Sequence, residues 1–517
     1  MSRLTLLLPL LVYLTFDPRH ARHPVGLDQL LLSVAALLAM PLLGLLYAKW
    51  CIARSHPRTL HVTAVRVNRV LGGLRLAALL WTAPAMYVFG WAEWLGGWTF
   101  TPHPSAVGAL VMTLPAYVGW LLLYAAQYPA ERAIREQAML AHLDEALPVH
   151  APPPLIRFLG HQLRTGLGVF VAPVLAVLAV RDGLVLTLDG VGWTGSAFAQ
   201  SLLFVVASAV VFALFPVALV RLLRTRPLPD GPLRRRLERL AARSGVRIRD
   251  ILLWETGYST CNAMVTGLLP GLRYVLLSDL LVESLTDRDV EAVFAHELGH
   301  IVHRHVAWYG AFLVGCAVLL GGVDVLLGGS ETAGTAGALG GGEAARSLPV
   351  DAAVAMAALA ATVLGFGYLS RRFENQADAY AARAVGGHTD ADELLAAFPP
   401  LGAVHAVSEN VAVAELLQPV ELADDTAHPL DRPVTPDGSA AFIRALSRVA
   451  WLNNIAPHAR NFTHGSIASR MARLSKLAAT PQATDAFDRH MTRIRYLLAA
   501  LLVAAAGLGA AVLWQGG

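Results

Sequence analysis

The chain has 517 residues, of which 55% are hydrophobic and 15% are charged, and its mean hydropathy is +0.52. These values exclude an ordinary water-soluble globular protein, and the length leaves room for roughly two to four domain-sized parts. The net charge of +4 and the sequence pI near 9.0 do not by themselves indicate a class of partner.

Long apolar stretches account for this composition. A helix needs about 20 residues to cross the hydrocarbon layer of a membrane, which is about 30 Å thick. Residues 4–16 are shorter and contain Pro9, and no small-residue cleavage site follows them, so we predict an uncleaved, short or tilted first span. The longer predicted spans are residues 27–47, 76–99, 105–127, 165–183, 197–220, 306–327, 350–369 and 495–514.

Basic residues mark every second predicted connection. Lys and Arg favour the cytoplasmic side of a membrane, so this alternation orients the whole chain. The large segments 221–305 and 370–494 then both face the cytoplasm and can form one domain. The basic connections are 48–75, 128–164 and the segment after residue 220, whereas 100–104 and 184–196 contain neither Lys nor Arg.

Two features exclude functions rather than indicate them. The arginine-rich segment 234–249 has no accompanying nucleic-acid-binding motif, so we expect no nucleic-acid partner. Beside a predicted span, these arginines are expected to fix its orientation and to contact anionic headgroups. The three cysteines, Cys51, Cys261 and Cys316, are far apart and lack CxxC spacing, which indicates neither a disulfide framework nor a cysteine zinc site.

The clearest motif is HELGH at residues 296–300. On a helix, His296 and His300 lie one turn apart on the same face and can bind one cation. Glu297 stands beside them, within reach of a water molecule on the metal. The alternative is an ordinary polar helix, because chance produces such a motif in roughly a few per cent of chains.

A zinc site of this kind needs a third protein ligand. The extended motif HExxHxxGxxH does not fit, because His303 stands where Gly is needed and Val306 stands where His is needed. We therefore expect His303 and His305 to face solvent or lipid headgroups.

A second helix offers the third ligand instead. The segment SRRFENQADAYA at 370–381 follows a predicted span, and its residues Glu374 and Asp378 share one face. Glu374 can complete the zinc site while Asp378 accepts a hydrogen bond from a ligand histidine. A surface pair of carboxylates is the alternative, but a transmembrane hairpin over 306–369 returns the chain to the side of HELGH.

These motifs together resemble a known family. HELGH, a transmembrane hairpin and then SRRFENQAD resemble the membrane-integrated zinc metallopeptidases that include HtpX and the type I CAAX prenyl protease. NAMVTG at 262–267 is similar to that family's strand motif. FTHGSIASRMARL at 462–474 resembles its late His-Pro…Arg segment, with Gly465 where the family usually has Pro. The resemblance covers about residues 230–310 and 365–475.

The resemblance implies a role for each site residue and one Zn2+ ion per chain. The implied zinc ligands are His296, His300 and Glu374. Glu297 is the implied general base, and Asp378 is implied to orient a ligand histidine. Asn262 and Ala263 would lie on the strand that receives the substrate, while His464 would stabilise the oxyanion and Arg470 would support the site.

We therefore predict a mainly α, polytopic α-helical membrane protein with a cytoplasmic zincin-type protease domain that contains a small β-sheet. The expected activity is zinc-dependent cleavage of membrane or membrane-proximal proteins at the cytoplasmic face of the cell membrane, in protein quality control. The scarcity of Lys against Arg indicates a GC-rich bacterial genome, and the expected location is then a bacterial inner membrane. The predicted parts are a multi-span region (1–220), a first protease half (221–305), a transmembrane hairpin (306–369), a second protease half (370–494) and a closing span (495–517).

Two alternatives stay open. One is a CAAX-type protease that processes lipidated C-termini, and the other is a zinc-binding membrane scaffold without catalysis. A site-2-type intramembrane protease is excluded, because its LDG motif should follow HELGH, whereas TLDG at 187–190 precedes it. The natural substrate and the oligomeric state are not predicted.

Overall fold

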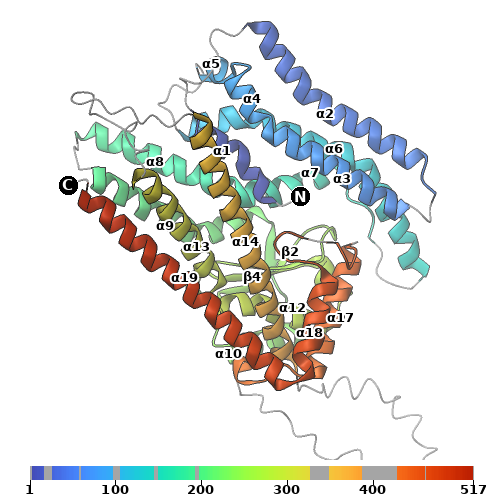
Figure 1. Cartoon of the computed structure of the whole chain (residues 1–517). Helices are drawn as coiled ribbons and strands as arrows, with labels where there is room; N and C mark the ends of the chain where they lie inside the picture. The colour runs from blue at the N-terminus through green and yellow to red at the C-terminus, as the bar shows by residue number, and fades with distance from the viewer. Residues whose placement is uncertain are drawn as a thin grey trace, which may run out of the picture. The chain divides into compact units, whose positions relative to one another are not determined.

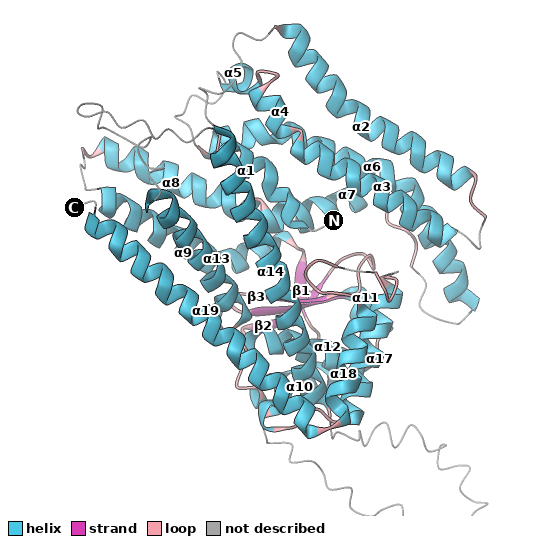
Figure 2. Ribbon diagram, in the orientation of Figure 1, coloured by secondary structure: helices cyan, strands magenta, loops and turns pink. Residues whose placement is uncertain are grey.

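The protein is described as a computed structural model (Figure 1), in which helices dominate and a small mixed sheet of four strands is present (Figure 2). This confirms the expected fold class of a mainly α protein with several apolar helices and a small sheet. The described residues are 3–16, 26–56, 60–96, 105–144, 150–192, 197–326, 348–386, 428–453, 455–459 and 461–515. Unit 1 comprises Met1–Pro227, Arg249–Thr260 and Thr266–Ser284, and unit 2 comprises Leu228–Ile248, Cys261–Val265 and Leu285–Gly517.

Unit 1 is a bundle of apolar helices that bury branched side chains between them. Leu37 of α2, Leu71 of α3 and Leu123 of α6 meet in one buried cluster. Leu31 and Leu42 of α2 are instead 58% exposed, which is the apolar outer surface that a helix presents to lipid. The helices of unit 1 are η1 (Arg3–Leu7), α1 (Leu8–Leu14), α2 (Leu27–Ala53), α3 (Leu60–Leu80), α4 (Thr82–Tyr87), α5 (Trp91–Gly96), α6 (Ala106–Asp144), α7 (Leu155–Leu163), η4 (Arg164–Gly168), α8 (Ala172–Gly190), α9 (Ala197–Leu222), η5 (Pro270–Leu272) and α11 (Asp279–Ser284).

Five helices in the described part of the chain are long and apolar enough to cross a membrane, and two bent helix pairs raise this number to seven. These are fewer than the eight or nine spans expected from the sequence, but they still make the chain a multi-pass membrane protein. The candidates are Leu27–Ala53, Val62–Tyr87, Ala106–Gln137, Leu203–Leu222 and Pro481–Ala511, with the bent pairs Leu155–Gly168 plus Ala172–Gly190 and Asp287–Val302 plus His305–Leu319.

The span predicted at residues 76–99 begins earlier in the structure. It covers Val62–Tyr87 rather than residues 76–99, so Arg75 lies on α3 and not in a basic loop. The buried Arg75 donates to Oε1 of Gln127 at 2.7 Å and to Oδ1 of Asn68 at 3.0 Å. The prediction was wrong because hydropathy penalises an arginine, whereas amide oxygens facing it reduce the cost of burying it.

The four strands have the order β1-β2-β4-β3. β1 (Thr225–Pro227) pairs antiparallel with β2 (Asp250–Trp254), and β2 pairs parallel with β4 (Tyr274–Ser278). In this register Thr225 lies opposite Trp254, and Asp250 lies opposite Tyr274. β2 and β4 read DILLW and YVLLS and are buried almost throughout, as is typical of strands covered on both faces. β3 (Ala263–Thr266) is last in the order and is therefore an edge strand.

Unit 2 contains the HELGH helix and three long helices, α13, α14 and α19, that run beside one another (Figure 1). Residues 327–347, within the predicted hairpin, lie outside the described part of the chain. The helices of unit 2 are α10 (Pro232–Arg243), α12 (Asp287–Val302), α13 (His305–Leu326), α14 (Leu348–Val385), η7 (Pro429–Asp431), α17 (Pro436–Leu452), α18 (Ile467–Ala479) and α19 (Pro481–Gln515).

The HELGH helix α12 begins at a side-chain cap and crosses α14 at a glycine. Oγ1 of Thr286 accepts a hydrogen bond from the backbone N–H of Asp289 at 3.2 Å. A Cβ atom on Gly299 would lie 3.0 Å from Cα of Ala377, so a side chain there would push α14 away. α12 carries charged residues along its length, so α13 is the apolar part of the bent pair.

Candidate metal centre

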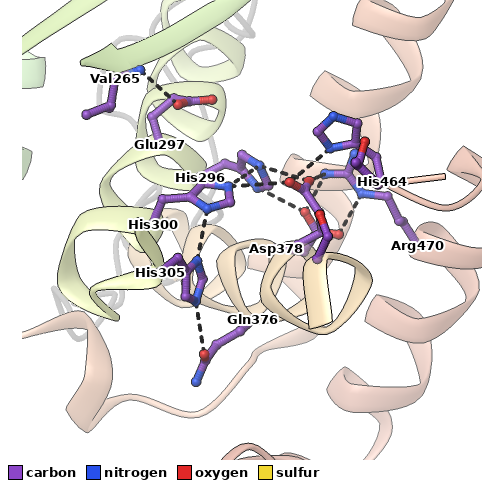
Figure 3. A network of polar contacts seen from close by, with 12 residues as sticks. Val265, His296, Glu297, His300, His305, Gln376, Asp378, His464 and Arg470 are labelled. Atoms are coloured by element: carbon purple, nitrogen blue, oxygen red, sulfur yellow. Dashed lines mark hydrogen bonds and ion pairs between the residues drawn. The ribbon is translucent and has the colours of Figure 1, made fainter. Parts of the chain in front are cut away.

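His296 and His300 project from one face of α12, one turn apart (Figure 3). Their Nε2 atoms lie 3.3 Å from each other, and the ring planes are 80° apart. Two nitrogens that each lie 2.0–2.1 Å from a tetrahedral zinc ion are separated by about 3.3–3.4 Å. The pair is therefore spaced as two ligands of one ion would be.

Glu374 of α14 brings a carboxylate to the same place. Its Oε2 lies 3.6 Å from Nε2 of His296, and its Oε1 lies 3.7 Å from Nε2 of His300. Burial alone would raise the pKa of Glu374, but the nearby rings of His296 and His464 outweigh burial and hold this pKa well below its usual range. Three ligand atoms within 4.8 Å of one another, two of them imidazole nitrogens and one an ionised carboxylate oxygen, fit a zinc ion.

Asp378, one turn after Glu374, lies behind His296. Nδ1 of His296 is 3.0 Å from Oδ1 of Asp378, which leaves Nε2 facing the cluster. Arg470 of α18 holds the same carboxylate with two bonds, from Nε to Oδ2 at 2.8 Å and from Nη2 to Oδ1 at 2.5 Å. Burial would raise the pKa of Asp378, but the Arg470 guanidinium lowers it, so the carboxyl group is ionised.

His464 reaches the cluster from the loop before α18. Its Nδ1 lies 2.9 Å from Oε1 of Glu374, while its side chain remains 52% exposed. Asn461 and Gly465 close the loop with two backbone hydrogen bonds, of 3.1 and 3.0 Å. Gly465 has φ +75°, a conformation that proline cannot adopt, so this loop differs locally from the His-Pro pattern that the family usually shows.

Glu297 points from α12 towards the edge strand. Its Oε2 accepts a hydrogen bond from the backbone N–H of Val265 in β3 at 3.2 Å (Figure 3). Burial raises the pKa of Glu297 to about 7, against the lowering effect of His296. A carboxyl group with such a pKa can both take up and release a proton near neutral pH.

The start of β3 is fixed by a side chain from far along the sequence. Asn453, which caps the C-terminus of α17, accepts from the backbone N–H of Cys261 at 3.0 Å and donates to its carbonyl oxygen at 2.6 Å. Ala263 is the first residue of β3, and Asn262 directly precedes it. The structure therefore places the NAMVTG segment beside Glu297, at the edge of the sheet.

The sequence misplaced two histidines and missed three further residues. His305 is fully buried and His303 is 9% exposed, so the expectation that both face solvent or headgroups was wrong. A polar residue after a helical motif is usually a surface residue, but here the helix changes direction just after the motif. Gln376 contacts His305, Arg495 contacts Gln376, and Asn453 contacts the backbone of Cys261 just before β3. No spacing in the sequence indicated these three residues.

The described fold holds a His-His-Glu cluster that could bind a metal ion, and sequence comparison gives the class and the family. The family model named Peptidase family M48 matches residues 227–478. A protease HtpX homolog from Aeropyrum pernix is 30% identical over 260 residues, which are 46% of this chain and 75% of that protein. The chain belongs to peptidase family M48, as the resemblance predicted.

Two further relatives match over shorter stretches, and one solved structure is similar over most of the chain. A CAAX prenyl protease 1 homolog from Arabidopsis thaliana is 31% identical over 106 residues, which are 20% of this chain and 25% of that protein. CAAX prenyl protease 1 from Saccharomyces cerevisiae is 37% identical over 82 residues, 16% of this chain and 18% of that protein. The crystal structure of S. mikatae Ste24p is 15% identical, with a TM-score of 0.41 over 87% of this chain and 99% of that one.

Proposed function

We propose that the chain is a zinc-dependent endopeptidase that cleaves membrane or membrane-proximal proteins in protein quality control. The observation that carries this proposal is the convergence of His296, His300 and Glu374 on one point, with Glu297 between that point and an edge strand. A zinc-binding scaffold would need the three ligands but not a buried carboxyl group with a raised pKa beside a strand.

His296, His300 and Glu374 would hold the zinc ion, which supplies Lewis acidity towards the scissile carbonyl and acidifies the attacking water. Glu297 takes the proton from that water as its oxygen bonds to the carbonyl carbon. When the carbon–nitrogen bond breaks, the same carboxyl group returns the proton to the leaving amine. The raised pKa of Glu297 suits both steps at neutral pH.

His464 and Arg470 complete this mechanism in different ways. His464 is half exposed and touches Glu374 with one ring nitrogen, so its ring can reach a carbonyl oxygen bound beside the metal ligands and stabilise the negative charge that develops there. Arg470 does not need to touch the substrate, because its bonds to Asp378 hold the residue that orients His296.

The substrate would bind as an extended segment along β3. An edge strand offers main-chain hydrogen bonds that do not depend on the sequence of the bound peptide, which suits a protease for damaged proteins. Asn262 and Ala263 stand where such a segment would begin to pair.

We place this site at the cytoplasmic face of a bacterial inner membrane. The alternation of basic and non-basic connections supports the orientation, although α3 contains part of the first basic segment. Accessibility labelling of single cysteines on each side of the membrane, in a variant without Cys51, Cys261 and Cys316, tests the orientation independently of activity.

The activity is tested with the purified full-length chain, using casein and an unfolded membrane protein as substrates. We expect cleavage, about one zinc ion per chain and loss of cleavage on chelation. Glu297→Gln should keep the zinc and abolish cleavage, whereas Glu238→Gln on the exposed face of α10 should behave as the parent. If Glu297→Gln cuts casein as fast as the parent, the mechanism is wrong; if no protein substrate is cut although zinc is bound, the scaffold alternative holds.

Processing of lipidated C-termini is the second candidate, favoured by the relatives named CAAX prenyl protease 1. It uses the same residues and differs in substrate. A prenylated C-terminal peptide and its unprenylated counterpart, offered side by side with unfolded membrane protein, separate the two. Cleavage restricted to the prenylated peptide would favour this candidate and overturn the quality-control proposal.

A further inference from the structure

A chain of buried polar contacts leads away from His300 on the side opposite to its metal-facing nitrogen. Nδ1 of His300 lies 2.9 Å from Nδ1 of His305, and Nε2 of His305 lies 3.1 Å from Oε1 of Gln376 (Figure 3). Nη2 of Arg495 donates to the same Oε1 at 3.3 Å. Residues from α12, α13, α14 and α19 thus meet in one series that ends on a charged group.

Only one assignment of hydrogen-bond donors and acceptors satisfies the whole series. Arginine can only donate, so the Gln376 atom that it meets is the amide oxygen, which can only accept. Nε2 of His305 must then carry a hydrogen, and in the neutral ring Nδ1 accepts one from Nδ1 of His300. His300 is left with a lone pair on Nε2, which is the nitrogen that faces His296 and Glu374.

The helix break between α12 and α13 makes this contact possible. Residues five apart on a continuous helix point about 140° away from each other, so His300 and His305 could not meet there. Arg304 has φ +55°, and the two helices are bent by 45° at this break. His305 is fully buried and stacks on Phe373 of α14 with ring centres 4.3 Å apart and planes 3° apart.

We propose that His305, held by Gln376 and Arg495, is a positioning residue that fixes His300 in the tautomer with Nε2 free to bind the metal. The proposal rests on the proposed zinc site and adds to it the residue that prepares one ligand. Asp378 serves His296 in the same way, so each ligand histidine has its own partner. Outer partners of this kind typically raise metal affinity by about 10–100-fold.

The test measures zinc affinity of the purified full-length protein by competition with a chromophoric chelator. His305→Phe keeps the ring stacked on Phe373 but removes the acceptor, and we expect zinc to bind about 10–100-fold more weakly. His305→Asn keeps an acceptor oxygen near the position of Nδ1 and should stay within about threefold of the parent. His303→Phe is the control, because it changes a second buried histidine that lies 3.0 Å from Arg495. Its zinc affinity should also stay within about threefold of the parent value.

Two further measurements separate positioning from general damage. The visible spectrum of the cobalt(II)-loaded protein should change in His305→Phe and be restored in His305→Asn, while the metal-free proteins melt at similar temperatures. Gln376→Met removes the acceptor for His305 at constant side-chain length and should weaken zinc binding in the same direction, which keeps the test valid if His305→Phe does not fold.

The outcomes distinguish this proposal from the proposed function. If the parent binds no zinc, both fail. If the parent binds zinc, and His305→Phe and Gln376→Met bind it as tightly with unchanged cobalt spectra, the positioning role alone is wrong. A loss in His305→Asn as large as in His305→Phe, with both variants folded, also overturns it, because the acceptor would then not be what matters.

Discussion

The two histidines of HELGH that we propose as zinc ligands are supported by different chemistry. His296 is backed by Asp378 and Arg470, which we call the charged flank, and both of these side chains are less than 10% exposed. His300 is backed by His305 and Gln376, which we call the neutral flank. The charged flank draws on α14 and α18, whereas the neutral flank draws on α13 and α14.

The difference between the two flanks shows that fixing the orientation of a histidine does not require a charged partner. Either flank can fix a tautomer, because each presents an acceptor to Nδ1 of its histidine. A carboxylate makes the imidazole more basic than a neutral acceptor does, and it must itself be paired when buried. We therefore expect damage to the charged flank to affect stability and metal binding together, and damage to the neutral flank to affect metal binding with little loss of stability.

Arg470→Met should have the largest effect on stability. The substitution leaves the Asp378 carboxylate buried without its guanidinium, which typically costs about 3–5 kcal/mol. Thermal unfolding of the detergent-solubilised protein should show a clear drop in Tm, together with weaker zinc binding. Arg473→Met, one turn further along the same helix, is the matched control and should change Tm little.

The double variant Asp378→Asn with Arg470→Met sharpens the same test. Removing both charges leaves no unpaired ion, so the double variant should be more stable than Arg470→Met alone. If the two losses simply add, the pair is not the unit that the geometry suggests. If Arg470→Met is as stable as the parent, the charged flank does not differ from the neutral one.

His464→Phe should leave both flanks intact and act on the reaction. The ring contacts Glu374, whose carboxylate lies near both His296 and His300, yet the ring remains half exposed. Loss of one donor to a developing oxyanion typically lowers kcat by about 10²–10³-fold, with zinc content unchanged. His458→Phe, on the exposed part of the same loop, is the control; a loss of zinc in His464→Phe would instead assign this histidine to metal binding.

The rate of cleavage should depend on pH through the ionisation of Glu297. Burial raises the pKa of Glu297 to about 7, and a general base must be ionised, so kcat/KM should be high above this pKa and fall as the pH drops through it. The charge of a bound zinc ion lowers the pKa, which puts the midpoint at or below about 7.

The two flanks should move this midpoint differently. The Arg470 charge interacts with Glu297, so Arg470→Met should raise the midpoint, whereas His305→Phe removes a neutral ring and should leave it in place. An equal shift of the pH profile in both variants would show that the division into a charged and a neutral flank is wrong.

Part of the charged flank could be predicted from the sequence, and the neutral flank could not. Asp378 lies one helical turn after Glu374, so periodicity places both on one face of a helix. Arg470 was implied only by the resemblance to a family. His305 depends on a change of helix direction at Arg304, a residue with a left-handed backbone that no local pattern announced. The burial of Arg75 in unit 1 could not be predicted from a local pattern either, because it depends on Gln127, which comes from another helix.

Asn453→Ala should have the smallest effect, because it acts on neither flank but on the strand beside Glu297. The side chain makes two hydrogen bonds to the backbone of Cys261, just before β3, and losing them costs about 1 kcal/mol each. A looser β3 should pair less well with a substrate, so KM for casein should rise several-fold while zinc affinity stays at the parent value. Asn461→Ala, in the His464 loop, is an asparagine control whose change should lower kcat rather than raise KM. A normal KM in Asn453→Ala would count against β3 as the substrate strand and leave the comparison of the two flanks untouched.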